Sequence, residues 1–153
     1  MWKTILAVLA LLAFLMSYAA FAESKAPGKS EDPIDAWMGA AMNQAVSTPE
    51  MVAVYTQAAK KWDDRLNQVY KACLAKLKTS QDQAALKEAQ KKWLAFRDAE
   101  RELIIAVCHF SPDGAVVGTI AQVISNDKFV ELLRQRVLQL EDYLKILEGK
   151  GNL

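Results

Sequence analysis

The chain has 153 residues, and its 19 Lys and Arg side chains against 18 Asp and Glu give a formal net charge of +1. This near-neutral balance gives no support for nucleic-acid binding, which requires a basic surface that displaces counterions from phosphates. The length suits one domain with a single hydrophobic core after a short N-terminal leader.

The N-terminal segment has the features of a secretory signal peptide. Lys3 precedes an apolar run over residues 5–16, and residues 20–22 read Ala-Phe-Ala, the small-x-small pattern that signal peptidase cleaves. The run is shorter than the ~20 residues of a membrane span, and an uncleaved N-terminal anchor is the alternative. We predict a signal peptide over residues 1–22 and a periplasmic or secreted mature chain without membrane attachment. The loss of Lys3 brings the net charge to zero.

Residues 23–31 contain Lys, Pro, Gly and Ser without an apolar period, which indicates a flexible leader. A single helical domain is predicted over residues 32–148. Its first helix is short: Asp32 supplies a cap, Pro33 occupies the first helical position, and the helix is expected to run to about Gln44.

A long second helix is predicted from Ser47 to about Thr79, because Ser47 and Glu50 have the spacing of a capping box. Apolar residues at three- and four-residue spacing define its buried face. This stripe consists of Met51, Tyr55, Ala58, Trp62, Leu66, Val69, Cys73 and Leu77.

A third helix is predicted from a second capping box, Ser80 with Gln83, to about His109, where the Ser-Pro-Asp-Gly sequence of residues 111–114 breaks the pattern. Its predicted buried face consists of Leu86, Ala89, Trp93, Phe96, Glu100, Leu103 and Val107.

A last helix is predicted from Thr119 to the glycines at 149 and 151, with an apolar stripe of its own. No segment alternates with period two. The fold class is therefore all-α: a small helical bundle of three long antiparallel helices plus a short N-terminal helix.

Several polar and aromatic residues carry a family resemblance. They are Asp63-x-x-Leu66-Asn67-x-x-Tyr70, Ala89-Gln90-x-x-Trp93-Leu94-x-Phe96-Arg97-Asp98-x-Glu100, Gly118-Thr119-Ile120 and Leu132-x-Arg134-Gln135-Arg136. Together they resemble the LprI-like lysozyme-inhibitor domain of exported bacterial proteins, long catalogued as a family of unknown function. The similarity covers about residues 50–144. It implies a small helical exported domain with a protein partner such as lysozyme.

The cysteines depart from this family's pattern. Relatives carry cysteines where this chain has Val54, Arg101 and, roughly, Asp127, so that only Cys73 and Cys108 are present. In a helical hairpin that turns near residue 80, Cys73 and Cys108 are separated by about 30 Å along the helix axes. A disulfide needs Cα atoms within about 7 Å of each other. We expect two reduced, largely buried thiols, unless the third helix folds back before Cys108.

Four charged residues of the motifs lie on or beside the apolar stripes of three helices: Asp63, Arg97, Glu100 and Arg136. A buried guanidinium needs several acceptors, and a carboxylate can accept two parallel hydrogen bonds from it. We interpret the four as a structural polar network that sets helix register. A polar pocket or contact surface is the alternative.

A partner surface is the second candidate site, and it consists of Asp32, Asp35, Trp37, His109 and Asp113. The stretch from residue 31 to residue 50 is acidic without any Lys or Arg, and an acidic surface suits a basic partner such as a common lysozyme. Trp37 either docks the first helix on the bundle or serves as an exposed anchor.

Catalysis finds little support. His109 is the only histidine, so that no histidine cluster for zinc exists, and no glycine-rich phosphate loop occurs. We predict no catalytic, metal or cofactor-binding residue, no cofactor, and no enzymatic activity. Two functions stand: an exported protein-binding module that inhibits lysozyme, or a structural or stress-related envelope protein without inhibitory activity. The pattern leaves the oligomeric state open.

Overall fold

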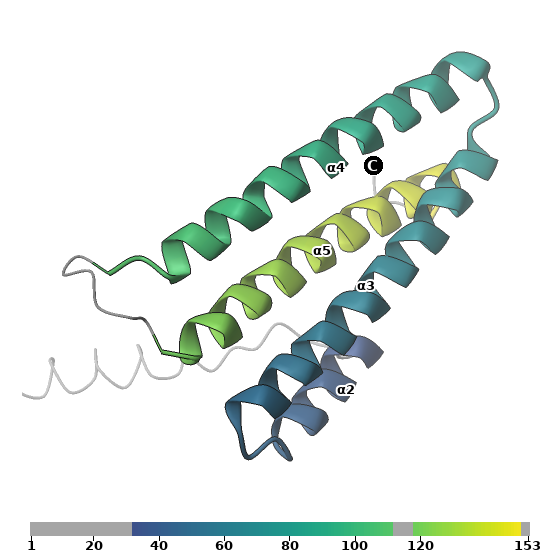
Figure 1. Cartoon of the computed structure of the whole chain (residues 1–153). Coiled ribbons are helices and arrows are strands. Elements are labelled where there is room, and N and C mark those ends of the chain that lie inside the picture. Colours follow the sequence, from purple (N-terminus) through teal and green to yellow (C-terminus); the bar gives the residue numbers. More distant parts are fainter. Residues whose placement is uncertain (1–31, 112–117, 151–153) are drawn as a thin grey trace, which may run out of the picture. The chain divides into compact units, whose positions relative to one another are not determined.

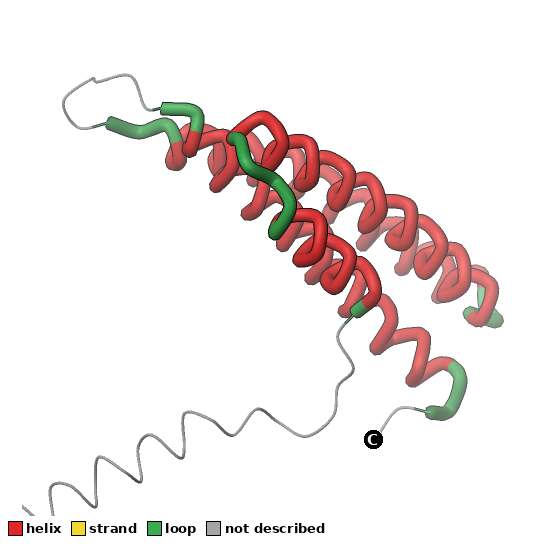
Figure 2. Tube along the Cα trace, turned by 90° about the horizontal axis from the view of Figure 1, so that it is seen from below, coloured by secondary structure: helices red, strands yellow, loops and turns green. Residues whose placement is uncertain are grey.

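The computed structural model describes residues 32–111 and 118–150, and its helices belong to the unit that begins at Pro33. These residues form only helices and loops, as Figure 2 shows. The helices are α2 (Pro33–Met42), α3 (Thr48–Lys76), α4 (Ser80–Cys108) and α5 (Ile120–Leu147). The predicted fold class, three long antiparallel helices plus a short N-terminal one, is confirmed.

Helix α5 lies between α3 and α4, and α2 packs against the first half of α3 (Figure 1). The closest packing is between α3 and α5, whereas α4 contacts α5 more sparsely and hardly touches α3. The two helices of the α3–α4 hairpin are therefore held together mainly through α5.

Helix starts follow the predicted capping chemistry, with one shift. The Ser47 hydroxyl accepts a hydrogen bond from the Glu50 amide at 3.4 Å, and the Glu50 carboxylate accepts from the amides of Val46 at 2.7 Å and Ser47 at 3.0 Å. These bonds confirm the predicted capping box and hold the pKa of Glu50 below its usual value, the Val46 amide being the largest cause. At α4 the cap is Thr79 rather than Ser80, because the Thr79 hydroxyl accepts from the Asp82 amide at 3.0 Å.

The hydrophobic core lies between α3 and α5. Its buried side chains are Ala58, Trp62, Leu66, Val69 and Cys73 from α3, and Val130, Leu133, Val137 and Leu140 from α5. The predicted stripe of α3 is thus confirmed at its central positions. An ion pair of 2.6 Å between Arg65 and Glu141 borders this core.

The predicted buried face of α4 is wrong in its second half. Phe96, Leu103 and Val107 are 52%, 53% and 64% exposed, and within α4 only Gln90 is buried. Leu86 and Trp93 pack against the core as predicted, whereas Gln90 is buried in place of Ala89, which is exposed. Apolar side chains occur on more than one side of α4, so that periodicity alone does not select the side that faces α5.

Both cysteines are free, as the distance argument predicted. Cys73 is buried in the α3–α5 core, where its thiol lies 3.3 Å from the Leu140 carbonyl oxygen, and Cys108 is half-buried at the end of α4. The pKa of the Cys73 thiol is raised by burial, which Arg136 partly opposes.

Helix α5 ends at Leu147, and Gly149 adopts a φ of 70°, the left-handed conformation that commonly terminates helices. Across the described ranges, no helix is long and apolar enough to cross a lipid bilayer. The predicted signal peptide and leader lie outside the described residues.

Candidate functional site

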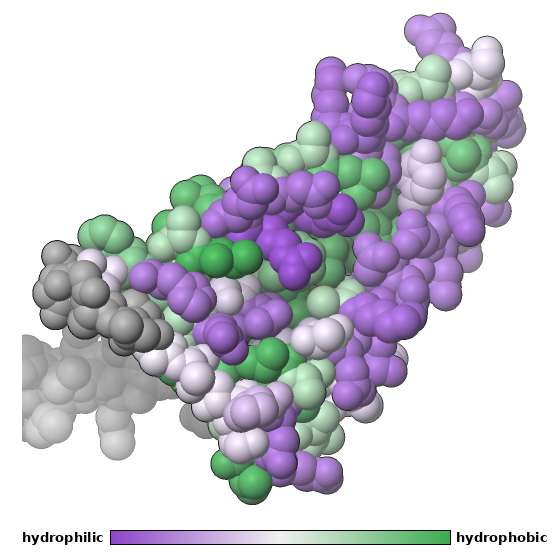
Figure 3. Space-filling view, viewed as in Figure 1, coloured by the Kyte–Doolittle hydropathy of each residue, from purple (hydrophilic) through white to green (hydrophobic). Residues whose placement is uncertain are grey.

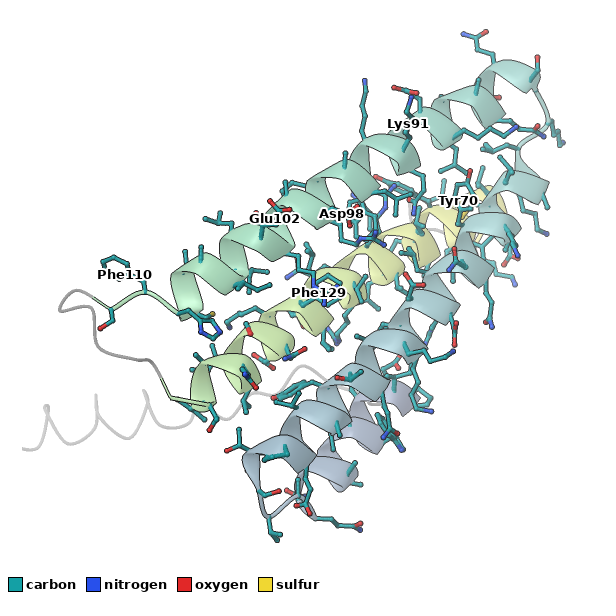
Figure 4. All side chains as sticks on the ribbon, in the orientation of Figure 1. Tyr70, Lys91, Asp98, Glu102, Phe110 and Phe129 are labelled. Carbon is teal, nitrogen blue, oxygen red and sulfur yellow. The ribbon has the colours of Figure 1, made fainter. Side chains whose placement is uncertain are left out.

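A polar cleft of about 360 Å³ opens between α3 and α4, where these helices diverge. Its walls come from one face of each helix. The lining residues are Asp63, Leu66, Asn67 and Tyr70 on α3, and Lys87, Gln90, Lys91, Leu94 and Arg97 on α4. In Figure 4, Lys91 lies on α4 and Tyr70 lies across the opening on α3.

Helical spacing explains why these residues share one cleft. The α3 positions 63, 66, 67 and 70 and the α4 positions 87, 90, 91, 94 and 97 recur every three or four residues, which places each set on one side of its helix. Leu66 is part of the core, so that its polar neighbours are positioned at the core's edge. The cleft is therefore a consequence of polar residues that flank two apolar stripes.

Arg97 spans the cleft. Its guanidinium donates two hydrogen bonds to Asp98 Oδ1, at 2.8 Å from Nε and 2.7 Å from Nη2, and its Nη1 lies 3.8 Å from Asp63 Oδ1 on the opposite helix. Asn67 Nδ2 donates to Asp63 Oδ2 at 3.3 Å and so orients that carboxylate. The Arg97 side chain stays 23% exposed, which leaves it accessible to a partner.

A buried arginine lies behind the cleft. Arg136 on α5 is 8% exposed and donates to Gln90 Oε1 from Nε at 3.1 Å and Nη2 at 2.9 Å, and to Gln139 Oε1 from Nη1 at 2.5 Å. Burial lowers the pKa of the Arg136 guanidinium, although an arginine remains charged at any physiological pH. No carboxylate in the described ranges forms an ion pair with it.

The cleft therefore has an excess of positive charge. Lys87 and Lys91 line it and Arg136 adds an uncompensated charge behind Gln90, whereas the charge of Arg97 is balanced by Asp98 and Asp63. Lys and Arg donate charge-assisted hydrogen bonds to carboxylates and phosphates. The arrangement suits contact with acidic groups of a partner.

The four residues predicted as a polar network do not form one cluster. Asp63 and Arg97 meet across the cleft, whereas Arg136 bonds to glutamines, and Glu100 lines a separate groove between α4 and α5. Gln90 belongs to the motif around Trp93, but it was assigned no role in the site from the sequence. The spacing of Leu86, Gln90, Trp93 and Arg97 places Gln90 on the side of α4 that faces the core. A prediction that allowed a polar residue on this side would have identified its structural role.

The residues predicted as a partner surface are dispersed. Asp35 on α2 accepts hydrogen bonds from Arg134 Nε on α5 at 2.9 and 3.2 Å, and Trp37 packs against the core with Lys61 Nζ 4.7 Å from its ring centroid. Asp32 directly precedes α2, whereas His109 caps the far end of α4. Asp113 lies outside the described residues. Basic neighbours thus offset the acidity of α2.

One family model matches the chain, that of the family described as lysozyme inhibitor LprI, over residues 39–140. The match spans the end of α2, all of α3 and α4, and most of α5, and it includes every residue of the cleft. No curated protein and no solved structure gives a significant match. The family is one of protein inhibitors and not of catalysts. The chain belongs to the LprI lysozyme inhibitor family.

Proposed function

We propose that this protein is an exported, periplasmic or secreted protein-binding module that inhibits a lysozyme through the α3–α4 cleft. The observation that carries the proposal is the family match over residues 39–140, within which the polar motif residues converge on that cleft. The apolar run and the Ala-Phe-Ala tripeptide of the first 22 residues support export.

The chemistry of the target favours a basic contact surface. Glycosidases of the lysozyme type hydrolyse sugar chains with a pair of acidic side chains that flank the scissile bond. A protein that blocks such a site gains most by presenting hydrogen-bond donors with positive charge to those carboxylates. Lys87 and Lys91 present such donors from one exposed side of α4, whereas the donors of Arg97 are bound to Asp98 and Asp63.

The acidic stretch around α2 supports the proposal less well. Its Asp35 carboxylate is bound by Arg134, and the Trp37 ring is covered by Lys61. A basic partner would have to displace these cations before it met free negative charge. We therefore place the contact on the cleft and not on α2.

The test is lysis of a bacterial cell suspension by lysozyme, followed as loss of turbidity. The wild-type protein is expected to slow lysis at micromolar concentration, and inhibition should weaken as salt increases because the contact is between opposite charges. Lys91→Glu places a carboxylate in the cleft and should raise the inhibitory concentration about tenfold or more.

Lys92→Glu is the matched control, because Lys92 is the next residue of α4, lies outside the cleft and is 77% exposed. It is expected to inhibit like the wild type. Equal loss in both variants would contradict the cleft as the contact surface. Absence of any wild-type inhibition at tens of micromolar would favour the alternative, a structural or stress-related envelope protein whose Arg97–Asp63 and Arg136–Gln90 contacts serve only to hold the helices together.

A further inference from the structure

A second, mainly apolar groove of about 630 Å³ lies between α4 and α5. Leu103 and Val107 on α4 and Ile124 on α5 line it and remain 53%, 64% and 44% exposed. A smaller hollow that includes Phe96 continues it, because both share Leu132 and Gln135 as lining residues. In Figure 3 hydrophilic side chains dominate the N-terminal half of α4, and hydrophobic ones appear toward its C-terminal half.

This groove and the proposed inhibitory cleft lie on opposite sides of α4. Lys87, Lys91 and Leu94 face the cleft with α3, whereas Leu103 and Val107 face the groove with α5. A molecule bound in the groove therefore leaves the cleft open. Occupation of the groove is thus independent of the proposed function.

Two charges in the groove lack a suitable partner among the residues that the structure describes. Glu100 is half-buried, yet no hydrogen bond or ion pair joins it to any described residue. Lys128, which lines the same groove from α5, reaches only its sequence neighbour Asp127, at 3.8 Å. A half-buried carboxylate is stabilised by a cation, and a cation of this kind is present on the same surface.

The apolar residues are arranged on both sides of this charged pair. Phe96 and Leu132 lie on one side along the groove, and Leu103 and Ile124 lie on the other. A two-fold axis that lies in the contact plane, runs along α4 and α5 and passes through the midpoint of Glu100 and Lys128 places α4 of each copy on α5 of the other. Each apolar side then meets the same side of the second copy, and Glu100 of each copy lies opposite Lys128 of the other, as a two-fold interface requires.

The exposed apolar area also matches a dimer. Four side chains that line the groove and the adjoining hollow, those of Phe96, Leu103, Val107 and Ile124, are 44% to 64% exposed. Since a large side chain covers roughly 150–200 Å², they leave roughly 300–400 Å² of apolar surface. A standard interface buries about 800 Å² per partner, of which about 60% is apolar, so these four side chains supply most of the required apolar area of about 500 Å².

We propose that the α4–α5 groove is the interface of a symmetric homodimer, in which Glu100 and Lys128 pair reciprocally between the two copies. The dimer carries two α3–α4 clefts. It also covers the apolar stripe of α4, which the single chain leaves in water.

The test is sedimentation velocity with light scattering on protein purified after expression of the full sequence. At roughly 10 µM, a concentration that populates micromolar dimers, the wild type should show twice the mass of one chain. Leu103→Glu buries two new charges in the interface and should weaken dimerisation about 100-fold. Ile105→Glu is the matched control, because Ile105 is 47% exposed, lies outside the groove and should not affect the dimer.

Charge exchange tests the pairing itself. Glu100→Lys and Lys128→Glu each bring like charges together twice per dimer and should each raise the dissociation constant about tenfold or more. The double variant restores opposite charges and should return to within about threefold of the wild type. A helical circular dichroism spectrum in every variant separates loss of the dimer from loss of folding.

A monomeric wild-type protein would overturn the proposal, whether residues 1–31 or another protein then covered the groove. A dimer that survives Leu103→Glu, or a double exchange that fails to restore it, would overturn it as well. The outcome is independent of inhibition, because Leu103→Glu should leave inhibition per chain unchanged and Lys91→Glu should leave the dimer intact.

Discussion

Helix α5 packs against its two long neighbours in different ways. Against α3 it contributes apolar side chains, among them Val137 and Leu140, to a core that contains the completely buried Trp62. Against α4 its central contact is polar, between Arg136 and the buried Gln90. The first interface provides hydrophobic stabilisation, whereas the second specifies how α4 lies and leaves polar groups at the surface.

Replacement of one tryptophan on each side tests this difference, and the largest effect is expected on the α3 side. Trp62 is 0% exposed, so Trp62→Ala should lower the free energy of unfolding by about 3–5 kcal/mol. Trp93 on α4 is only partly buried, so Trp93→Ala should cost about 1–2 kcal/mol. Denaturant unfolding followed by circular dichroism measures both.

Trp62→Phe provides a milder control, since Trp62 Nε1 is buried without a hydrogen-bond partner in the described part of the chain. Loss of the indole N–H removes no hydrogen bond. Trp62→Phe should therefore lower the free energy of unfolding by much less than Trp62→Ala does. Equal costs for Trp62→Ala and Trp93→Ala would show that α4 is held as firmly as α3.

The Arg136–Gln90 contact should produce the next largest effect. Gln90→Leu leaves a buried guanidinium short of an acceptor and should cost about 2–3 kcal/mol, whereas Arg136→Met removes the charge and should cost about 1–2 kcal/mol. The double variant should lower the free energy of unfolding by less than the sum of the two single variants, because both partners are then absent. Additive costs in this double-mutant cycle would mean that the two residues act separately.

The smallest effect concerns pH and the two thiols. Burial raises the pKa of Cys73 above 9.0, so the folded protein holds this proton more tightly than the unfolded chain does. The resulting stabilisation is complete at neutral pH and is lost as the pH rises above about 9, by at most ~1.4 kcal/mol per pH unit. Cys73→Ala should therefore lose less stability than the wild type between pH 8 and pH 10.

Cys108→Ala is the control for removal of a thiol, because Cys108 is only half-buried. It should follow the wild-type pH dependence. Tyr55, whose pKa is raised mainly by burial and also by Asp127, is present in all three proteins and does not affect their differences. Identical slopes for Cys73→Ala and the wild type would indicate that solvent reaches the α3–α5 core.

The sequence was sufficient to predict the helices and the core-facing side of α3, because capping residues and a single apolar stripe define both. It was insufficient for α4. Leu86 and Trp93 lie inward as predicted, yet Phe96, Leu103 and Val107, which the apolar pattern groups with them, are exposed, and Gln90 is buried. Helical periodicity identifies apolar lines on one helix, whereas the choice between two such lines depends on the shape of the neighbouring helix.

The candidate site was predictable to a similar extent. Asp63 and Arg97 were identified from the motifs, and they meet at 3.8 Å. The contribution of Gln90 was not, because a glutamine on a core-facing line becomes meaningful only when its partner Arg136, 46 residues away, is placed beside it. Contacts of this sequence separation are not encoded in local spacing.

The unbridged state of Cys73 and Cys108 has a consequence for how the protein is made. Its helices reach their final packing without any oxidation step, so neither an oxidase nor an isomerase limits the rate of maturation. The chain should acquire the same fold in a strongly reducing compartment as outside the cell, and treatment with dithiothreitol should leave its melting temperature unchanged.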